Sequence, residues 1–456
     1  MYRMDVHAFL RGRMKHRRTL LALCLVLLVA PLALAQNVNF KEYKLKNGLR
    51  VILAEDHSAP TYSIAVTYNA GSRDERKGRT GFAHLFEHMM FQGSENVGKG
   101  EHMIIVENNG GNINGNTTPD RTQYFETLPA NQVDLGLFIE ADRMRSLAIT
   151  QANLDNQRAT VQEERRARVD NQPYGRTFEE IYALAFDNFA NQHSTIGSMA
   201  DLSAASVKDV SDFFKTYYAP NNAAVTIVGD FDSVEMMKKM ERYFVDIPAQ
   251  AAPPAPNVAE PKQTAEKRKT IEDPLAQLPR LDIVYKIPQG NTPDSYALDY
   301  LSDVLSRGNS SRLYLKLVKE KELVTAASCG LDMRRGPGLF WCTLSLRPGK
   351  DPAEVEKALY EELEKTKTEL ITDAEVAKQR MAVRRSQAEQ QQSTLGRATT
   401  MGEFAVFYND PGLINTYGTK LLAVSKAQIQ QAAKTFLTET NRTVVLTMPK
   451  RAQEDK

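Results

Sequence analysis

Gly81-Phe-Ala-His-Leu-Phe-Glu-His-Met-Met-Phe-Gln-Gly93 places two histidines and a glutamate within five residues, His84 to His88. Apolar residues flank them on a helical period, and a glycine follows where helices commonly end. In a helix, His84 and His88 lie one turn apart on one face, so both imidazoles can reach one metal ion. Glu87 lies beside His88, where it can polarise a metal-bound water. The alternative is a pair of helix-surface histidines beside a solvated glutamate.

A second segment, residues 153–168, supplies a candidate third ligand. Two imidazoles and one carboxylate are a typical zinc set that leaves one coordination position open for water. The segment has a helical period, and one stripe of it holds Leu154, Gln157, Val161, Glu164 and Arg168. Glu164 therefore shares the face of the apolar residues, whereas Glu163 points nearer to solvent. The alternative is that both are surface charges of a solvated helix.

These residues and their spacing resemble the pitrilysin, insulinase and mitochondrial processing peptidase family of zinc endopeptidases. Here 75 residues separate His88 from Glu164, residues 110–124 are similar to the family's GGxxNAxTxxDxTxY stretch, and residues 158–164 are similar to its RxxVxxE. The resemblance implies that His84, His88 and Glu164 bind one zinc ion and that Glu87 is the general base. One departure is Gln157, because the family often has an acidic residue seven positions before the ligand.

The resemblance also implies the reaction and a place for the substrate. We expect a zinc-dependent endopeptidase that hydrolyses peptides or unfolded protein segments, in which a zinc-bound water attacks the scissile carbonyl and Glu87 accepts its proton. The stretch Gly110 to Tyr124 is rich in glycine and asparagine, so it is suited to a sheet edge that binds an extended peptide. Asn112, Asn114 and Gly115 are then the expected backbone contacts. An ordinary loop is the alternative.

A partner subunit is expected from what the second half lacks. The family often carries an Arg and a Tyr seven residues apart, in its second domain or in a separate subunit, that hold substrate and transition state. In the similar stretch here, residues 313–325, Val318 and Thr325 occupy these places. Neither side chain can supply the missing contacts. We therefore predict a heterodimer with a homologous inactive subunit that supplies Arg and Tyr; a homodimer is the alternative.

The N-terminal residues predict export. Residues 1–18 hold six basic residues, and an almost unbroken apolar run leads to Ala33-Leu-Ala35. This order is typical of a secretory signal peptide, here residues 1–35, whether translation starts at Met1 or at Met14. We expect a periplasmic protein of a Gram-negative type envelope, with no membrane span after signal cleavage. An uncleaved anchor and a lipoprotein based on Cys24 are the alternatives.

Charge and cysteine content narrow the function further. Cleavage after Ala35 removes six basic and one acidic residue, so the formal net charge changes from +2 to −3. A mildly acidic exported protein without basic runs is a poor candidate for nucleic-acid binding. Cys329 and Cys342 flank a turn-like segment between two apparent strands. An oxidising compartment permits a disulfide between them; two buried free thiols are the alternative.

An internal repeat predicts the domain organisation. Residues 207–228 and 426–447 each predict a helix, a turn and an apolar strand, and identical residues recur at an offset of 219. Duplication of a domain of roughly 200 residues explains this; convergence is the alternative. A segment rich in Pro and Ala, followed by charged residues, lies between the copies and is typical of a linker. The expected division is a signal peptide (1–35), an N-terminal zinc peptidase domain (36–249), a linker (250–278) and a homologous C-terminal domain without metal (279–456).

Both halves mix strands with helices, including one long helix expected from Asp373 to about Phe407. The predicted class is α+β, with two homologous α/β-sandwich domains of the processing-peptidase-like metallohydrolase fold and antiparallel-rich sheets with helices packed on one face. Two other functions remain consistent with the sequence. One is a catalytically silent assembly or chaperone-like subunit that retains the peptidase fold, and the other is a zinc hydrolase acting on a different bond.

Overall fold

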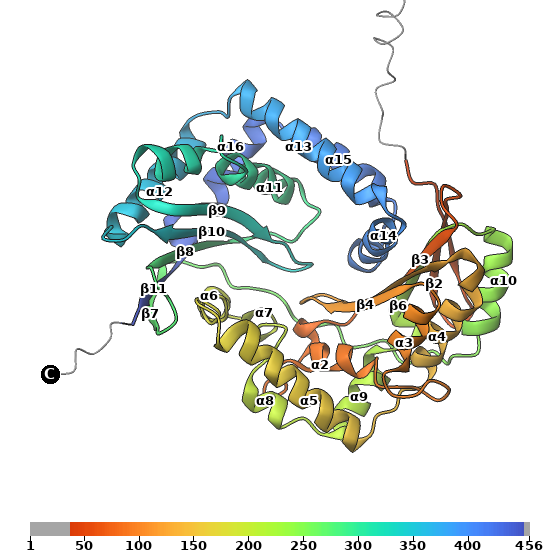
Figure 1. Ribbon diagram of the computed structural model, residues 1–456. Coiled ribbons are helices and arrows are strands. Elements are labelled where there is room, and N and C mark those ends of the chain that lie inside the picture. Colours follow the sequence, from red (N-terminus) through yellow and green to blue (C-terminus); the bar gives the residue numbers. More distant parts are fainter. Residues whose placement is uncertain (1–36, 451–456) are drawn as a thin grey trace, which may run out of the picture. The chain divides into compact units, whose positions relative to one another are not determined.

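Two mixed β-sheets organise the chain, one in each half (Figure 1). The computed structural model describes residues 37–450, so the predicted signal peptide lies outside the described residues. The first sheet has the strand order β1-β2-β6-β3-β5-β4 and the second has the order β7-β11-β8-β10-β9. The strands are β1 Lys41–Lys44, β2 Arg50–Glu55, β3 Thr61–Tyr68, β4 Asn112–Thr117, β5 Thr122–Pro129, β6 Ala223–Gly229, β7 Lys267–Asp273, β8 Arg280–Ile287, β9 Val324–Asp332, β10 Gly338–Leu346 and β11 Arg442–Pro449.

Helices follow the strands in both halves, as the α+β class requires. In the first half they are α2 Phe82–Met89, α3 Glu101–Asn108, α4 Val133–Arg145, α5 Gln151–Arg165, α6 Thr177–Ala185, α7 Phe189–Gln192, α8 Met199–Ser203, α9 Val207–Tyr217 and α10 Ser233–Phe244, with a π-helix at Arg166–Asp170 after α5. In the second half they are α11 Pro293–Ser306, α12 Pro352–Thr368, α13 Asp373–Gln392, α14 Thr394–Tyr408, α15 Leu413–Leu422 and α16 Lys426–Phe436, with a π-helix at Tyr314–Glu320. No helix within residues 37–450 has the length and apolar character needed to cross a bilayer.

The two sheets share one topology. In the first, β6 pairs in parallel with β2 and antiparallel with β3; in the second, β11 pairs in parallel with β7 and antiparallel with β8. The strands β5 and β4 then continue the first sheet as β10 and β9 continue the second. The repeated segments correspond to α9 with β6 and to α16 with β11. The topology therefore agrees with the duplication that the sequence predicts.

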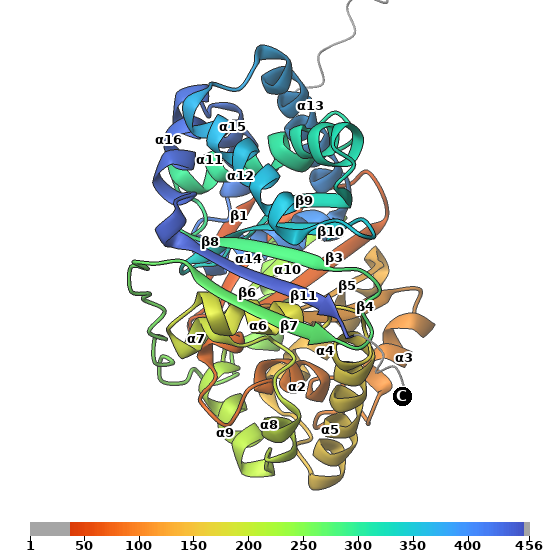
Figure 2. The same cartoon turned by 90° about the vertical axis from the view of Figure 1, so that its left-hand side faces the viewer.

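Part of the predicted linker is a strand. Residues 267–273, inside the segment 250–278, form β7 and pair with β11 along their whole length (Figure 2). The sequence Lys-Arg-Lys-Thr-Ile-Glu-Asp has no hydrophobic period because β7 lies at the edge of its sheet and most of its side chains are exposed or half-buried. Edge strands commonly carry such charges, which block further pairing. The linker prediction is therefore wrong for these residues, while the proposed domain boundaries stay a prediction.

Each sheet is covered on both faces. Helices of the same half pack on one face of each sheet, as predicted, and form the two largest apolar cores. The opposite face of the first sheet packs against α14, whose Met401 and Phe404 meet Ile52 and Val228. The opposite face of the second sheet packs against α6 through Ile181. Each half thus supplies one helix to the sheet of the other, which explains why strands such as β3 are buried along almost their full length.

The helix predicted from Asp373 to about Phe407 is two helices. Ser393 has an extended backbone, and its hydroxyl accepts a hydrogen bond from the N–H of Gly396 (2.9 Å), so it ends α13 and caps α14. Within α14, a Cβ on Gly402 would lie 2.5 Å from the hydroxyl of Thr67 on β3. The helix can approach the first sheet this closely only because residue 402 has no side chain.

The hairpin of β9 and β10 carries a disulfide between Cys329 and Cys342, which are directly paired in the register of the two strands. Its turn reaches the first half of the chain. There the backbone N–H of Arg335 donates to Asp120 (2.9 Å), and the Arg335 guanidinium donates to Asn69. Asp120 lies in the turn between β4 and β5. The second half therefore contacts the β4–β5 hairpin, and β4 borders the candidate site.

Candidate metal centre and peptide-binding edge

The helix α2 begins at Gly81 and is capped by a carboxylate from outside the helix. Gly81 has a φ of 83°, a conformation that glycine adopts without strain. The Glu75 carboxylate accepts hydrogen bonds from the backbone N–H groups of Gly81 (2.9 Å) and Ala83 (2.8 Å). Because Glu75 is fully buried, these bonds fix the first turn of the helix, from which His84 projects.

The helices α2 and α5 bring the three predicted ligands together. His84 Nε2 lies 3.7 Å from one Glu164 oxygen, and His88 Nε2 lies 3.2 Å from the other. One donor atom from each side chain lies within 4.8 Å of the other two. Within residues 37–450 this is the only group of three or more His, Cys, Asp or Glu side chains arranged in this way. Two imidazoles and one carboxylate at such a spacing could hold one metal ion.

The local electrostatics favour the protonation states that ligate a metal. Burial, followed by the nearby His88, lowers the pKa of His84 to about 4, so its imidazole is neutral at pH 7. A hydrogen bond with His88 is the largest influence on Glu164 and lowers its pKa, which keeps the carboxylate ionised. His84 Nδ1 is buried and has no hydrogen-bond partner among the described residues. A neutral imidazole and an ionised carboxylate are the ligand forms that zinc requires, so the donor set fits zinc. Among the described residues, no carboxylate bonds to His84 Nδ1 to orient the ring.

Glu87 faces a cavity of about 670 Å³ that it shares with the three ligand candidates. The hydroxyl of Thr117, on β4, donates to Glu87 Oε2 (2.6 Å) and fixes the carboxylate. Burial raises the pKa of Glu87, which is the direction that makes a carboxylate a better proton acceptor. Gly115 leaves room beside it, because a Cβ there would lie 3.3 Å from Glu87 Cγ.

The predicted substrate contacts lie on an edge strand. β4 pairs with β5 alone and ends the first sheet. Asn114 and Gly115 line the cavity, whereas Asn112 does not. The Gly115 N–H donates to Asn114 Oδ1 (2.8 Å). An open strand edge beside a carboxylate and a ligand cluster is an arrangement in which an extended peptide can be bound and hydrolysed.

Other residues singled out in the sequence have ordinary structural surroundings. Glu163 is exposed and pairs with Arg166 (2.9 Å), as its helix phase predicts. Gln157 lines the cavity and donates to Asn156 (2.8 Å). Val318 is buried in the core of the second half, and Thr325 is exposed on β9.

Some site residues were missed from the sequence. Thr117 belongs to the motif stretch 110–124, so its position in the strand was a usable signal. Arg168, which pairs with Glu164 (2.6 Å), lies on the stripe that the helix period defines. Glu75 carries no such signal, because its contact with α2 exists only in the folded chain.

Comparison with known proteins identifies the family. Residues 50–198 match the family model described as insulinase (peptidase family M16), and residues 204–383 match the model described as peptidase M16 inactive domain. The zinc protease PqqE of Helicobacter pylori is 29% identical over 408 residues, which cover 89% of this chain and 92% of that protein. The mitochondrial-processing peptidase subunit beta of Blastocladiella emersonii is 28% identical over 205 residues, which cover 45% of this chain and 44% of that protein.

Solved structures agree with this assignment. A protease from Helicobacter pylori has a TM-score of 0.86 at 29% identity, with 90% of this chain and 100% of that chain covered. The periplasmic protease PqqL from Escherichia coli shares the fold, with a TM-score of 0.75 at 18% identity, and 92% of this chain covers 48% of that chain. The two-sheet fold and the two matched segments together place the chain in a class of peptidases. The chain belongs to the insulinase family, peptidase family M16.

Proposed function

We propose that this protein is an exported zinc-dependent endopeptidase that hydrolyses peptides or unfolded protein segments. One observation carries the proposal. The donor atoms of His84, His88 and Glu164 converge within 4.8 Å of one another in a cavity that also holds the Glu87 carboxylate and borders the open edge of β4. Ligand cluster, proton acceptor and peptide-binding edge are the three parts that metal-assisted peptide hydrolysis needs.

In the proposed mechanism His84, His88 and Glu164 hold the zinc ion. Zinc supplies Lewis-acid chemistry, since it acidifies a water molecule and polarises a carbonyl group. Glu87 accepts the proton of the attacking water and then donates it to the leaving amine. The hydrogen bond from Thr117 holds the Glu87 carboxylate in the orientation that this transfer needs.

β4 binds the substrate in this proposal. An extended peptide adds to the sheet beside β4. One of its carbonyl groups accepts a hydrogen bond from the Gly115 N–H and replaces the Asn114 amide oxygen, which accepts that bond in the structure. Asn112 extends the same edge and contacts the peptide through its backbone. Gly115 lets the peptide approach Glu87, because no side chain intervenes.

A homologous inactive subunit is proposed to complete the site by supplying an Arg and a Tyr, which Val318 and Thr325 do not replace. Two relatives support a paired arrangement. The processing-peptidase relative is named as a subunit, and this chain matches 93% of the first half of PqqL but 48% of the whole. The alternative is a catalytically silent assembly subunit. The cluster that argues against it is intact and consists of His84, Glu87, His88 and Glu164.

Export to the periplasm is part of the proposal. The N-terminal sequence up to Ala35 has the order of a secretory signal peptide. The disulfide between Cys329 and Cys342 is of a kind that persists in oxidising compartments. The Escherichia coli relative by fold is named as a periplasmic protease.

Glu87→Gln tests the proposal. The variant should bind zinc as the wild type does and lose about 10²- to 10⁴-fold in turnover of a quenched fluorescent peptide, because the proton acceptor is gone. Glu163→Gln is the matched control, since it changes an exposed carboxylate next to Glu164. Native cleavage by Glu87→Gln would refute the assigned role. A wild-type protein that binds no zinc and cleaves no peptide would favour the silent subunit.

A further inference from the structure

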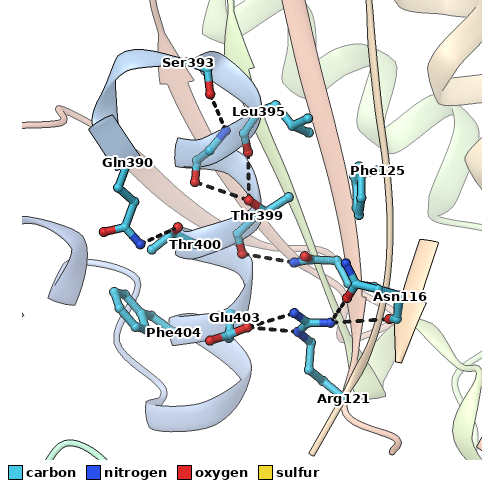
Figure 3. A pocket seen from close by; sticks show the side chains of 12 residues that line it. Asn116, Arg121, Phe125, Gln390, Ser393, Leu395, Thr399, Thr400, Glu403 and Phe404 are labelled. Carbon is cyan, nitrogen blue, oxygen red and sulfur yellow. Dashed lines mark hydrogen bonds and ion pairs between the residues drawn. The ribbon is translucent and has the colours of Figure 1, made fainter. Parts of the chain in front are cut away.

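A second cavity, of about 470 Å³, lies between α14 and the strands that carry Asn116 and Phe125 (Figure 3). Side chains alternate along a strand, and Gly115 and Thr117 face Glu87. Asn116, between them, therefore faces the opposite side of the sheet and lines the second cavity. Asn116 lines both cavities, so the two meet at the open edge of β4.

The two halves of the chain build this cavity together. Its floor comes from β4 and β5, with Gln123 and Phe125 on the same face as Asn116. Its wall comes from the end of α13 and from α14. The Gln123 amide donates to the backbone oxygen of Thr399 (3.0 Å), which fixes α14 over β5. The second half of the chain, which has no ligand cluster of its own among the described residues, thereby borders the peptide-binding edge.

The cavity contains one ion pair whose charges cancel. Nε and Nη2 of Arg121 both lie 3.0 Å from one oxygen of Glu403, and Nη1 donates to the backbone oxygen (3.3 Å) and the side-chain oxygen of Asn116 (Figure 3). The other polar lining is uncharged. Gln390, at the end of α13, donates to the Thr400 hydroxyl (3.0 Å). The walls therefore offer amides, hydroxyls and a neutralised ion pair.

A peptide bound along β4 would place its side chains alternately on the two sides of the sheet. One set points toward the cavity of Glu87 and the other toward the second cavity. We propose that the second cavity is a substrate subsite for uncharged polar side chains, amides above all, at alternate positions of the bound peptide. This inference rests on the proposed function, because it requires a peptide on β4.

Charge balance selects the side-chain class. Arg121 is almost fully buried and Glu403 is two-thirds buried, so each already uses the other as its counter-ion. A substrate Lys or Glu would bring a third charge that is partly removed from water and lacks a full partner, which is unfavourable. A Gln or Asn side chain supplies both a donor and an acceptor without adding charge.

Peptide binding to the zinc-loaded Glu87→Gln protein tests the proposal, because that variant should bind peptides without cleaving them. A labelled peptide is varied at each position in turn to Gln, Leu, Lys or Glu, and its affinity is measured by fluorescence anisotropy. We expect Gln to bind about three- to tenfold more tightly than Lys or Glu, the size of one or two net hydrogen bonds. This preference should occur at alternate positions.

Two variants of the ion pair should move the preference in opposite directions. With Glu403→Gln the charge of Arg121 is unpaired, so the same positions should favour Glu. With Arg121→Gln the charge of Glu403 is unpaired, so they should favour Lys. Glu389→Gln, on the exposed side of α13 where Glu389 pairs with Arg385 (3.5 Å), is the control and should keep the preference for Gln.

The results separate the two proposals. Peptide binding without a preference at alternate positions, or with a preference that neither charge variant moves, overturns the subsite and leaves peptide binding intact. Failure of every peptide to bind overturns both. Thermal unfolding of each variant shows whether it is folded, and Glu403→Gln carries the test by itself if Arg121→Gln does not fold.

Discussion

His193 Nε2 lies 2.9 Å from Glu75 Oε2, beneath the first turn of α2. Every partner of the imidazole is an acceptor, because Nδ1 faces the Phe189 carbonyl (2.9 Å) and Nε2 also faces the Ser72 carbonyl (2.8 Å). Burial lowers the pKa of His193, but the hydrogen bond and charge of Glu75 outweigh it and the pKa is raised. Burial raises the pKa of Glu75, but His193 and the N–H groups of Gly81 and Ala83 oppose this shift. Because every partner of the His193 ring is an acceptor, we infer an imidazolium paired with the Glu75 carboxylate.

Glu75→Gln should therefore weaken both the fold and the proposed metal site. A carboxamide would place N–H groups against the N–H groups of Gly81, Ala83 or His193, and a buried charged partner would be left without its counter-ion. Loss of one member of a buried pair costs about 3 kcal/mol. We expect that loss in urea unfolding, together with weaker zinc binding in competition with a chromophoric chelator.

Glu107→Gln is the matched control, because Glu107 is exposed on the neighbouring helix α3. It should change neither the unfolding midpoint nor the zinc affinity. If Glu75→Gln lowered stability but left zinc affinity unchanged, the pair would be structural without positioning the ligands.

Thr117→Val should lower turnover without removing zinc. Valine keeps the shape of threonine but cannot donate to Glu87, whose bond with Thr117 is 2.6 Å long. Hydrogen bonds to charged groups contribute about 1.5–3 kcal/mol, so a roughly tenfold or larger loss of kcat is expected. Thr117→Ser retains the hydroxyl and should restore most of the activity. Equal activity of the Val variant and the wild type would contradict this role.

The sequence predicted those features that depend on local periodicity. The helical period assigned Glu164 to the face of Val161 and Glu163 to solvent, and in the structure Glu164 is half-buried while Glu163 is exposed. The glycine- and asparagine-rich stretch 110–124 was expected at a sheet edge, and β4 lies there. Roles in zinc and substrate binding stay predictions, because the fold places residues without testing what they bind.

Features that depend on contacts between distant residues could not be predicted. Residues 267–273 form a strand because they pair with β11 at the edge of the second sheet. Their charges resemble those of a linker, so their composition did not indicate a strand. The pairing of Glu75 with His193 and the docking of α14 at Gly402 against Thr67 join segments that lie far apart in the sequence. The break at Ser393 was readable, since serine is a strong N-cap, but the helical period on either side concealed it.

Acid should loosen the docking of α14. Asp56 follows β2 and pairs with Arg397 of α14, and hydrogen bonds from Ser58 and Arg397 lower its pKa to about 2. A depressed carboxyl pKa stabilises the fold above the unfolded pKa near 4, and this stability is lost as the pH falls through about 2. Solvent screens this partly exposed pair, so the contribution is on the order of 1 kcal/mol at neutral pH, and Ser58 supplies part of it.

Asp56→Asn tests this contribution. The variant should be less stable than the wild type at pH 7, and the difference should shrink as the pH falls from about 4 to 2, where the wild-type carboxylate is protonated as well. Urea unfolding across this range measures it. A difference that stays constant with pH would mean that the charge of Asp56 does not contribute.

Reduction should destabilise the second half of the chain through the hairpin of β9 and β10. The disulfide closes a segment with a sequence separation of 13 residues, and a loop of about this length contributes roughly 3 kcal/mol when cross-linked. Wild-type protein should therefore unfold at lower urea concentration in the presence of dithiothreitol. The variant Cys329→Ala with Cys342→Ala should be destabilised from the start and insensitive to dithiothreitol.

Because the hairpin turn contacts Asp120, next to β4, through Arg335, peptide affinity should fall along with stability. An unfolding midpoint of the wild type that does not change with reductant would show that the bond adds no stability, and unchanged peptide affinity in a destabilised variant would confine its effect to the second sheet.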